Sequence, residues 1–255
     1  MEARLTRRGF LRALAAAAAA AAGAGLLDSG FLEVTRLRLG LGVRVAVLAD
    51  LHLHGPPLRS IAEAVEHLRP RIVVLAGDFV DELTPGLGGL PEWLERFLPR
   101  GSTGLAVLGN HEHRLLESGR VGLRELERLL EEAGFTLLVD STVEAGGLRV
   151  AGVDWAWPPE GYRARVERLE AEEPRLVVAH SPDAFHYASR GVWASGHTHG
   201  GQVCLPGARS VVTNSVYGYR WGLYRRRGAV MYVSRGLGEM LPPRIYCRRQ
   251  LLVLE

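Results

Sequence analysis

The chain of 255 residues contains no lysine, so all 31 of its basic side chains are arginines. Four of these arginines and one of the 28 acidic residues lie within the first 24 positions, which leaves 27 of each charge for the rest of the chain. The formal net charge of +3 therefore belongs to the N-terminal segment. Because the remainder is neutral, the composition excludes nucleic-acid binding by bulk charge, and we expect no nucleic-acid partner.

Cysteine is also scarce. Cys204 and Cys247 are too few for a disulfide framework and lack the close spacing of a metal-binding pair. We predict two buried free thiols. One disulfide bridge is the alternative if the protein is exported.

The N-terminal segment has the composition of a signal peptide. Residues 5–25 read LTRRGFLRALAAAAAAAAGAG, a polar start followed by an alanine-rich run that ends on small residues. The string TRRGFLR resembles the twin-arginine translocation motif, with Arg7, Arg8, Phe10 and Leu11 at the matching positions. We therefore predict a signal segment at 1–25, the twin-arginine translocase as a partner, and a location in the cell envelope or periplasm.

The fate of this segment stays open from the sequence. Cleavage at a small-x-small site such as Ala22-Gly23-Ala24 would release the protein, whereas an uncleaved segment would hold it at a membrane surface. The run is rich in alanine and shorter than the roughly 20 strongly apolar residues of a stable span. The alternative is an alanine-rich helix of the domain itself, which would have no amphipathic face.

The rest of the chain, 26–255, is expected to form a single domain, because no linker of proline, glycine and serine divides it. Apolar runs rich in β-branched residues alternate there with stretches of helical periodicity. We predict strands at 43–48, 71–75, 104–108, 136–139, 148–153, 175–179, 192–194, 230–233 and 251–254, and helices at 58–68, 91–97, 123–133 and 161–171. This order predicts an α/β fold, a four-layer sandwich of two mixed β-sheets flanked by helices.

Polar side chains follow five of the predicted strands, at the ends where open α/β sheets place their sites. Asp50 and His52 are two residues apart in an extended segment, so their side chains point to the same side. A single fragment of this kind occurs by chance, but five in order after apolar strands indicate a metal site. The fragments are Asp50-Leu51-His52, Gly77-Asp78, Gly109-Asn110-His111-Glu112, His180 and Gly196-His197-Thr198-His199.

These motifs in this order resemble the calcineurin-like metallophosphoesterase family, from Val43 to the C-terminus. GHTHGGQ from Gly196 and YVSRGLG from Tyr232 resemble more narrowly its bacterial branch of exported and membrane-associated phosphodiesterases. The resemblance implies a hydrolase of phosphoester bonds with a binuclear metal site at the strand ends. It implies that Asp50, His52 and His199 hold the first metal, that Asn110, His180 and His197 hold the second, and that Asp78 bridges both.

Two further residues of these motifs receive roles outside the ligand set. By the same resemblance, His111 protonates the leaving alkoxide or stabilises charge on the phosphoryl oxygens, which suits a side chain that titrates near neutral pH. Glu112 is expected to orient an imidazole. Asp81 is expected to support its loop by hydrogen bonds and not to bind metal.

The ligand types predict two divalent metal ions. Imidazole suits zinc, iron and manganese, and carboxylate or amide oxygen suits harder ions, so we expect manganese first, with iron or zinc as alternatives. Two ions about 3.5–4 Å apart would clamp a phosphoryl group and lower the pKa of a bridging water, which then supplies hydroxide for in-line attack.

Three functions remain in competition. The leading hypothesis is a phosphodiesterase that acts outside the cytoplasmic membrane. The second is a pyrophosphatase of the UDP-2,3-diacylglucosamine type, acting on a nucleotide-linked lipid; twin-arginine export argues against it, because such a precursor is met at the cytoplasmic face. The third, of another class, is a non-catalytic metal-binding module, which the retention of both ligand sets together with His111 disfavours.

Overall fold

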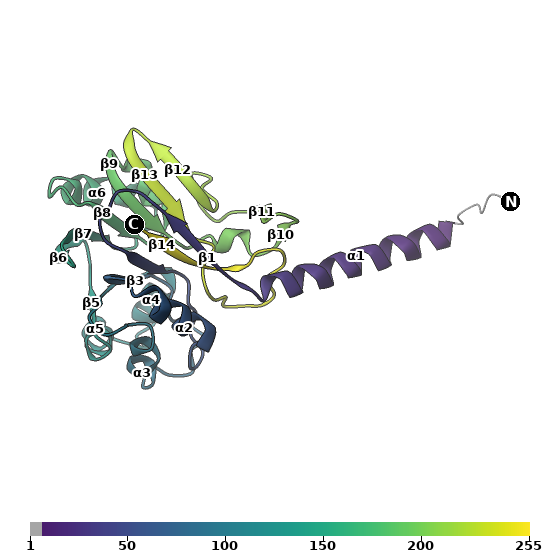
Figure 1. The fold of residues 1–255 in the computed structure, drawn as a ribbon, viewed down its shortest axis with the longest axis horizontal. Helices are drawn as coiled ribbons and strands as arrows, with labels where there is room; N and C mark the ends of the chain where they lie inside the picture. Colours follow the sequence, from purple (N-terminus) through teal and green to yellow (C-terminus); the bar gives the residue numbers. More distant parts are fainter. Residues whose placement is uncertain (1–6) are drawn as a thin grey trace.

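Two six-stranded β-sheets pack against each other and carry helices on their outer surfaces (Figure 1). The computed structural model describes residues 7–255; the first six residues of the predicted signal segment lie outside this range. The predicted four-layer α/β sandwich is confirmed.

The first sheet has the order β1-β14-β2-β3-β4-β5. Strands β2 to β5 run parallel, β14 is antiparallel to β2, and β1 is parallel to β14. All residues of β2 and β3 are buried, as expected for parallel strands covered on both faces. The bounds are β1 (Leu32–Leu37), β14 (Arg249–Leu254), β2 (Val45–Leu48), β3 (Ile72–Ala76), β4 (Thr103–Val107) and β5 (Phe135–Leu137).

The second sheet has the order β12-β13-β9-β8-β7-β6. Its four central strands are parallel, and the edge strands β12 and β6 are antiparallel to their neighbours. A two-stranded hairpin lies outside both sheets, β10 (Cys204–Leu205) and β11 (Arg209–Ser210). The bounds are β12 (Gly222–Arg226), β13 (Gly228–Val233), β9 (Arg190–Ser195), β8 (Leu176–Ala179), β7 (Leu148–Val153) and β6 (Ser141–Ala145).

Three apolar clusters form the core. One joins the facing sides of the two sheets, the second packs the helices α2 to α5 on the first sheet, and the third packs α6 on the second sheet. Helix α5 shows the pattern behind this packing, because its buried residues Leu126, Leu129 and Leu130 follow helical spacing. The bounds are α2 (Arg59–Leu68), α3 (Leu90–Glu95), α4 (Asn110–Glu117), α5 (Leu123–Glu132) and α6 (Tyr162–Glu170), with short 3₁₀ helices η1 (Pro159–Gly161), η2 (Pro182–Tyr187) and η3 (His199–Gly201).

The predicted strands and helices all appear, with bounds that differ by at most two residues. The prediction missed helix α4, whose sequence NHEHRLLE begins with the polar residues of a motif. It also missed the edge strands β1, β6 and β12, which are only partly buried and therefore lack an apolar run. Cys204 and Cys247 are buried free thiols, as predicted.

Helix α1 (Arg7–Ser29) projects from the domain (Figure 1). Its stretch Phe10–Ser29 is long and apolar enough to cross a membrane by length and composition, a property that a signal sequence near the N-terminus shares. The helix also continues four residues beyond position 25, the expected end of the signal segment. Its last turn contacts the domain, because Gly25 accepts a hydrogen bond from the Tyr246 amide (3.1 Å) and Ser29 Oγ accepts one from the Cys247 amide (3.1 Å).

Trp193 offers a test of the packing on the outer side of the second sheet. Its side chain is fully buried, meets the Phe185 ring edge to face and donates its indole N–H to Arg190 O (2.9 Å). We expect Trp193→Ala to lower the free energy of unfolding by about 3–5 kcal/mol, because a large cavity remains. The control Trp157→Ala removes a ring that is 68% exposed and should cost less than about 0.5 kcal/mol. Guanidinium chloride unfolding measures both, and equal losses would contradict this packing.

Candidate metal centre

The predicted fragments of both sheets meet at the carboxyl ends of the central strands. Asp50 and His52 follow β2, Asp78 follows β3, and Asn110 begins α4 just after β4. His180 follows β8, and the two remaining histidines follow β9. A hydrogen bond ties the two sheets together here, because the main-chain amide of His197 donates to the side-chain Oδ1 of Asp50 (2.8 Å).

The first group of candidate ligands consists of Asp50, His52, Asp78 and His199, whose ligand atoms lie within 4.8 Å of one another. His52 Nε2 and His199 Nε2 are 3.2 Å apart. His52 Nδ1 lies 2.8 Å from Asp81 Oδ2. Because a carboxylate only accepts, Nδ1 carries the proton and Nε2 presents its lone pair to the centre of the group.

The second group consists of Asp78, His180 and His197, again within 4.8 Å. His180 Nδ1–H donates to Ala76 O (2.9 Å), which leaves Nε2 as the free lone pair. That Nε2 is 3.1 Å from each of three atoms: Asp78 Oδ2, Asn110 Oδ1 and His197 Nδ1. Asp78 therefore belongs to both groups and lies between them.

Two features show that these groups fit metal ions. Asp50 Oδ2 is buried and has no hydrogen-bond partner within residues 7–255, although an unpaired buried oxygen is costly. Burial lowers the pKa of His180, but the carboxylates of Asp78 and Asp50 outweigh this effect and raise the pKa to about 9. The two buried carboxylates thus favour positive charge at this position, which a divalent cation would supply.

The backbone at these strand ends is unusual. Non-glycine residues rarely adopt positive φ, and such conformations persist only where the surroundings impose them. Here the turns after β2 and β3 brace each other, since the Asp50 amide donates to Gly77 O (3.1 Å) and the His52 amide to Asp78 O (2.9 Å). The positive φ values are 53° for Asp50, 45° for His52, 50° for Asp78, 71° for His197 and 49° for His199.

Two glycines let the ligands approach. A Cβ atom on Gly77 would lie 2.5 Å from His180 Nδ1, and one on Gly236 would lie 2.8 Å from Asp50 Cβ. Both glycines also have positive φ, at 78° and 76°. Gly236 belongs to the YVSRGLG motif, so this downstream motif packs directly against Asp50.

Glu112 does not orient an imidazole, contrary to the expectation. Its carboxylate accepts hydrogen bonds from three backbone amides, of Asp78 (2.9 Å), Gly109 (2.7 Å) and Val80 (3.0 Å). It therefore holds the turns after β3 and β4 in place. Orientation of an imidazole belongs instead to Asp81, which contacts His52 and also His54 (2.9 Å).

His111 lies beside the first group, with its ring centroid 5.0 Å from that of His52. Its amide donates to Asp78 Oδ1 (2.9 Å), and its Nδ1 is hydrogen-bonded to Glu82. The sequence analysis missed Glu82, whose only signal was its position four residues after Asp78.

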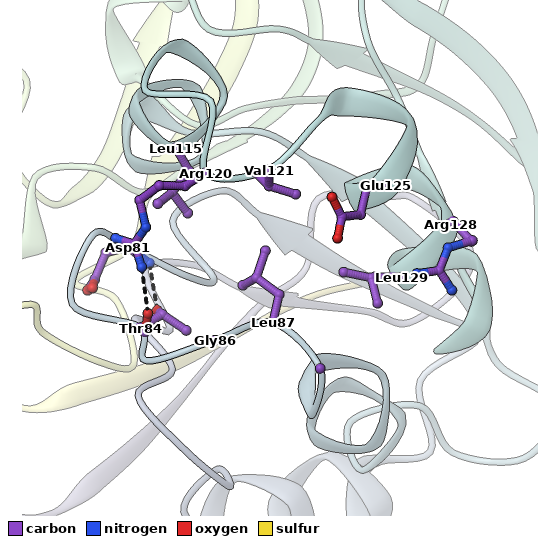
Figure 2. A pocket seen from close by; sticks show the side chains of 11 residues that line it. Asp81, Thr84, Gly86, Leu87, Leu115, Arg120, Val121, Glu125, Arg128 and Leu129 are labelled. Carbon is purple, nitrogen blue, oxygen red and sulfur yellow. Dashed lines mark hydrogen bonds between the residues drawn. The ribbon is translucent and has the colours of Figure 1, made fainter.

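Arg120 holds the loop that carries Glu82. The Arg120 guanidinium donates to the carbonyl oxygens of Glu82 and Thr84. Figure 2 shows this arginine reaching Thr84 at one end of a cavity of about 200 Å³ that also borders Asp81. This contact fixes the carboxylate that meets His111.

A cleft of about 480 Å³ opens in front of the second group. Trp155 forms part of its wall, with its ring centroid 5.2 Å from that of His197. The lining combines imidazole, guanidinium, amide and indole groups, so it can take both an anion and an apolar moiety. The lining residues are Asn110, His111, His113, Arg114, Glu117, Trp155, Trp157, His197 and Asn214.

The backbone role of Glu112 can be tested. Glutamine at this position has one acceptor oxygen in place of two, so Glu112→Gln should loosen the turns that carry Asp78 and Asn110. We expect the affinity for manganese to fall about 10- to 100-fold. Isothermal titration of the metal-stripped protein measures this, with Glu127→Gln on the exposed face of α5 as the matched control. Equal affinities in the two variants would contradict the assigned role.

Known proteins are similar in sequence to this chain over most of its length. The chain is 28% identical to phosphodiesterase YaeI of Escherichia coli (strain K12), covering 98% of this chain and 99% of that protein. It is 27% identical to the uncharacterized metallophosphoesterase YkuE of Bacillus subtilis (strain 168), covering 98% and 97%. It is 26% identical to UDP-2,3-diacylglucosamine pyrophosphatase LpxG of Chlamydia trachomatis serovar D, covering 88% and 89%.

A family model described as calcineurin-like phosphoesterase matches residues 43–201. This range contains both groups of candidate ligands together with His111 and Glu112. The chain therefore belongs to the calcineurin-like phosphoesterase family and is a metal-dependent hydrolase of phosphoesters.

Proposed function

We propose that this protein is a binuclear metal-dependent phosphodiesterase. The observation that carries the proposal is the position of Asp78 between two groups of ligand atoms, with the free lone pairs of His52 and His180 on either side. We assign Asp50, His52 and His199 to one ion, and Asn110, His180 and His197 to the other. The mixed imidazole and oxygen set favours manganese, with iron or zinc as alternatives.

When bound, a pair of divalent ions polarises a phosphoryl oxygen and lowers the pKa of a water molecule enough for attack near neutral pH. The chain supplies the geometry for this chemistry. Asp81 and Ala76 O fix the tautomers of His52 and His180, and Glu112 fixes the turns that present Asp78 and Asn110. The 480 Å³ cleft receives the phosphodiester beside these groups.

His111 is the proposed proton donor to the leaving oxygen. Its Nδ1 is occupied by Glu82, so Nε2 is the atom available to the substrate. In the protonated ring, Nε2–H transfers its proton to the departing alkoxide, which leaves as a neutral alcohol. The hydrogen bond to the Glu82 carboxylate holds the ring in the orientation that leaves Nε2 for the substrate.

A second candidate is a pyrophosphatase for a nucleotide-linked lipid. The observation in its favour is the similarity to UDP-2,3-diacylglucosamine pyrophosphatase LpxG across most of both chains. The mixed lining of the cleft, with two tryptophans beside polar groups, would also suit a large amphipathic substrate. A non-catalytic metal-binding module remains the alternative of another class, and the presence of both ligand groups together with His111 argues against it.

We further propose that α1 directs export by the twin-arginine pathway. Arg7 and Arg8 are the first residues of this exposed helix, and the apolar stretch that follows could serve as a signal or as an anchor. The pathway carries folded proteins, so both ions could be loaded before transit. The substrate would then be a phosphodiester of the cell envelope.

The first test is hydrolysis of bis-p-nitrophenyl phosphate by the metal-stripped protein refilled with manganese. We expect manganese-dependent turnover that disappears in Asp78→Asn, because the amide removes the charge shared by both groups. Glu63→Gln, which changes an exposed carboxylate paired with Arg59 on α2, is the matched control and should retain turnover.

Bound metal without diester turnover, with manganese, iron or zinc alike, would contradict the phosphodiesterase. Cleavage of a UDP-linked lipid by the same preparation would then establish the second candidate. Failure with both substrates would favour the non-catalytic module.

The role of His111 predicts a dependence on the leaving group. His111→Gln should lower kcat by about 10²- to 10⁴-fold for a diester with an alkyl leaving group, which needs a proton. The loss should be much smaller for bis-p-nitrophenyl phosphate, because p-nitrophenolate leaves without one. Steady-state kinetics on both substrates at equal metal content measures the contrast. Equal losses would show that His111 stabilises phosphoryl charge and does not donate the proton.

A further inference from the structure

We propose that one surface of this protein, the docking face, lies against a phospholipid bilayer. The docking face consists of residues 26–31 at the end of α1, residues 202–216 around the β10–β11 hairpin, and residues 241–246. It carries large apolar side chains that are more exposed than is usual for a soluble surface. The most prominent are Leu27 (76% exposed), Phe31 (63%), Leu205 (56%), Val212 (60%) and Leu241 (62%).

Backbone hydrogen bonds join the three segments into one surface. Gly25 of α1 accepts from the Tyr246 amide (3.1 Å), and the preceding residue Ile245 forms a parallel bridge with Val203. The Cys204 amide donates to Ile245 O (2.9 Å). Gln202 Nε2 also donates to Pro243 O (3.2 Å), so residues 241–246 lie beside residues 202–216. Figure 1 accordingly shows β10 and β11 beside the base of α1.

Helix α1 indicates that the occupant is a bilayer. The stretch Phe10–Ser29 has the length and composition of a membrane span, and 20 helical residues at 1.5 Å each match the hydrocarbon core of about 30 Å. The last turn of the helix, which packs on the domain, then lies at the lipid surface together with the residues around it. The exposed apolar side chains of the docking face surround this turn.

The charge of the hairpin segment agrees with an anionic lipid surface. Between Gln202 and Val216 the chain has one basic residue, the exposed Arg209, and no acidic residue. The acidic residue at the end of α1, Asp28, is paired with Arg248. Apolar side chains interspersed with arginine are typical of surfaces that enter the head-group region of acidic phospholipids.

The docking face also borders the catalytic cleft. Asn214 lines the cleft and donates Nδ2–H to His197 O (3.0 Å), and it is only two residues from Val212. This last step rests on the proposed function: a phosphodiester in a lipid head group could pass from the bilayer to the ligand groups without leaving the surface. The substrate class would then be a membrane-embedded phosphodiester.

The test uses the full chain reconstituted in vesicles of phosphatidylglycerol and phosphatidylethanolamine. Cys204 and Cys247 are buried, so an environment-sensitive fluorophore will label an introduced cysteine. Val212→Cys places it on the docking face. The matched control Leu123→Cys, 44% exposed, places it at the start of α5, on the side of the domain away from α1 (Figure 1).

We expect the label at position 212 to shift to shorter wavelength and to be quenched by lipids with nitroxide head groups, while the label at position 123 stays water-like. A chain that floats with the vesicles but shows no shift at position 212 would overturn the docking face and point to a protein partner. Equal shifts at both positions, or a chain that does not float, would overturn it as well. The label reports contact whether or not the protein hydrolyses phosphodiesters, so this result is independent of the proposed function.

Discussion

The carboxylate of Asp78 lies between two groups of imidazoles that the two sheets supply together, and most of the surrounding structure serves to keep it there. Its main-chain amide is held by Glu112, one of its oxygens accepts from the His111 amide, and the other faces His180 at 3.1 Å. A buried negative charge needs such partners, since an unpaired one would be strongly destabilising. Burial raises the pKa of Asp78, but the neighbouring imidazoles, His180 first, outweigh this and hold it well below its usual range.

The sandwich provides the rigidity that this arrangement requires. The apolar cluster between the sheets contains residues of β2, β3 and β4 together with residues of β7, β8 and β9, so the strands that carry the ligands are packed against one another. Close packing of this kind has low compressibility, so the strand ends have little freedom to shift. The surrounding fold therefore sustains the five positive φ values at the ligands. The favourable free energy of packing between the sheets offsets the backbone strain of these residues.

The N-terminal helix and the catalytic centre are connected through a short stretch near the C-terminus. Residues 244–248 contact the last turn of α1 on one side, through the Tyr246 amide and the Arg248–Asp28 ion pair. On the other side Cys247 Sγ donates to His199 O (3.1 Å), and Arg244 lies 3.2 Å from His199 Nδ1. The last turn of α1 and a candidate metal ligand are thus connected through the same few residues.

The sequence by itself determined the layered α/β fold and the set of residues that converge, because apolar strands followed by D-x-H, G-D, G-N-H-E, H and G-H-x-H leave a local signal at each strand end. It could not determine which carboxylate hydrogen-bonds to which imidazole or backbone amide. Glu112 was expected to orient an imidazole, whereas Asp81 does so, and Glu82 was not identified at all. Those pairings join residues 29 to 34 positions apart. They depend on how β3, β4 and the following loops pack, and a periodicity along the chain carries no such information. The arrangement of residues 26–31, 202–216 and 241–246 was likewise decided only by tertiary structure. The first of these segments precedes the others by about 170 residues and meets them through the hydrogen bond from Tyr246 to Gly25, and Val203 pairs with Ile245.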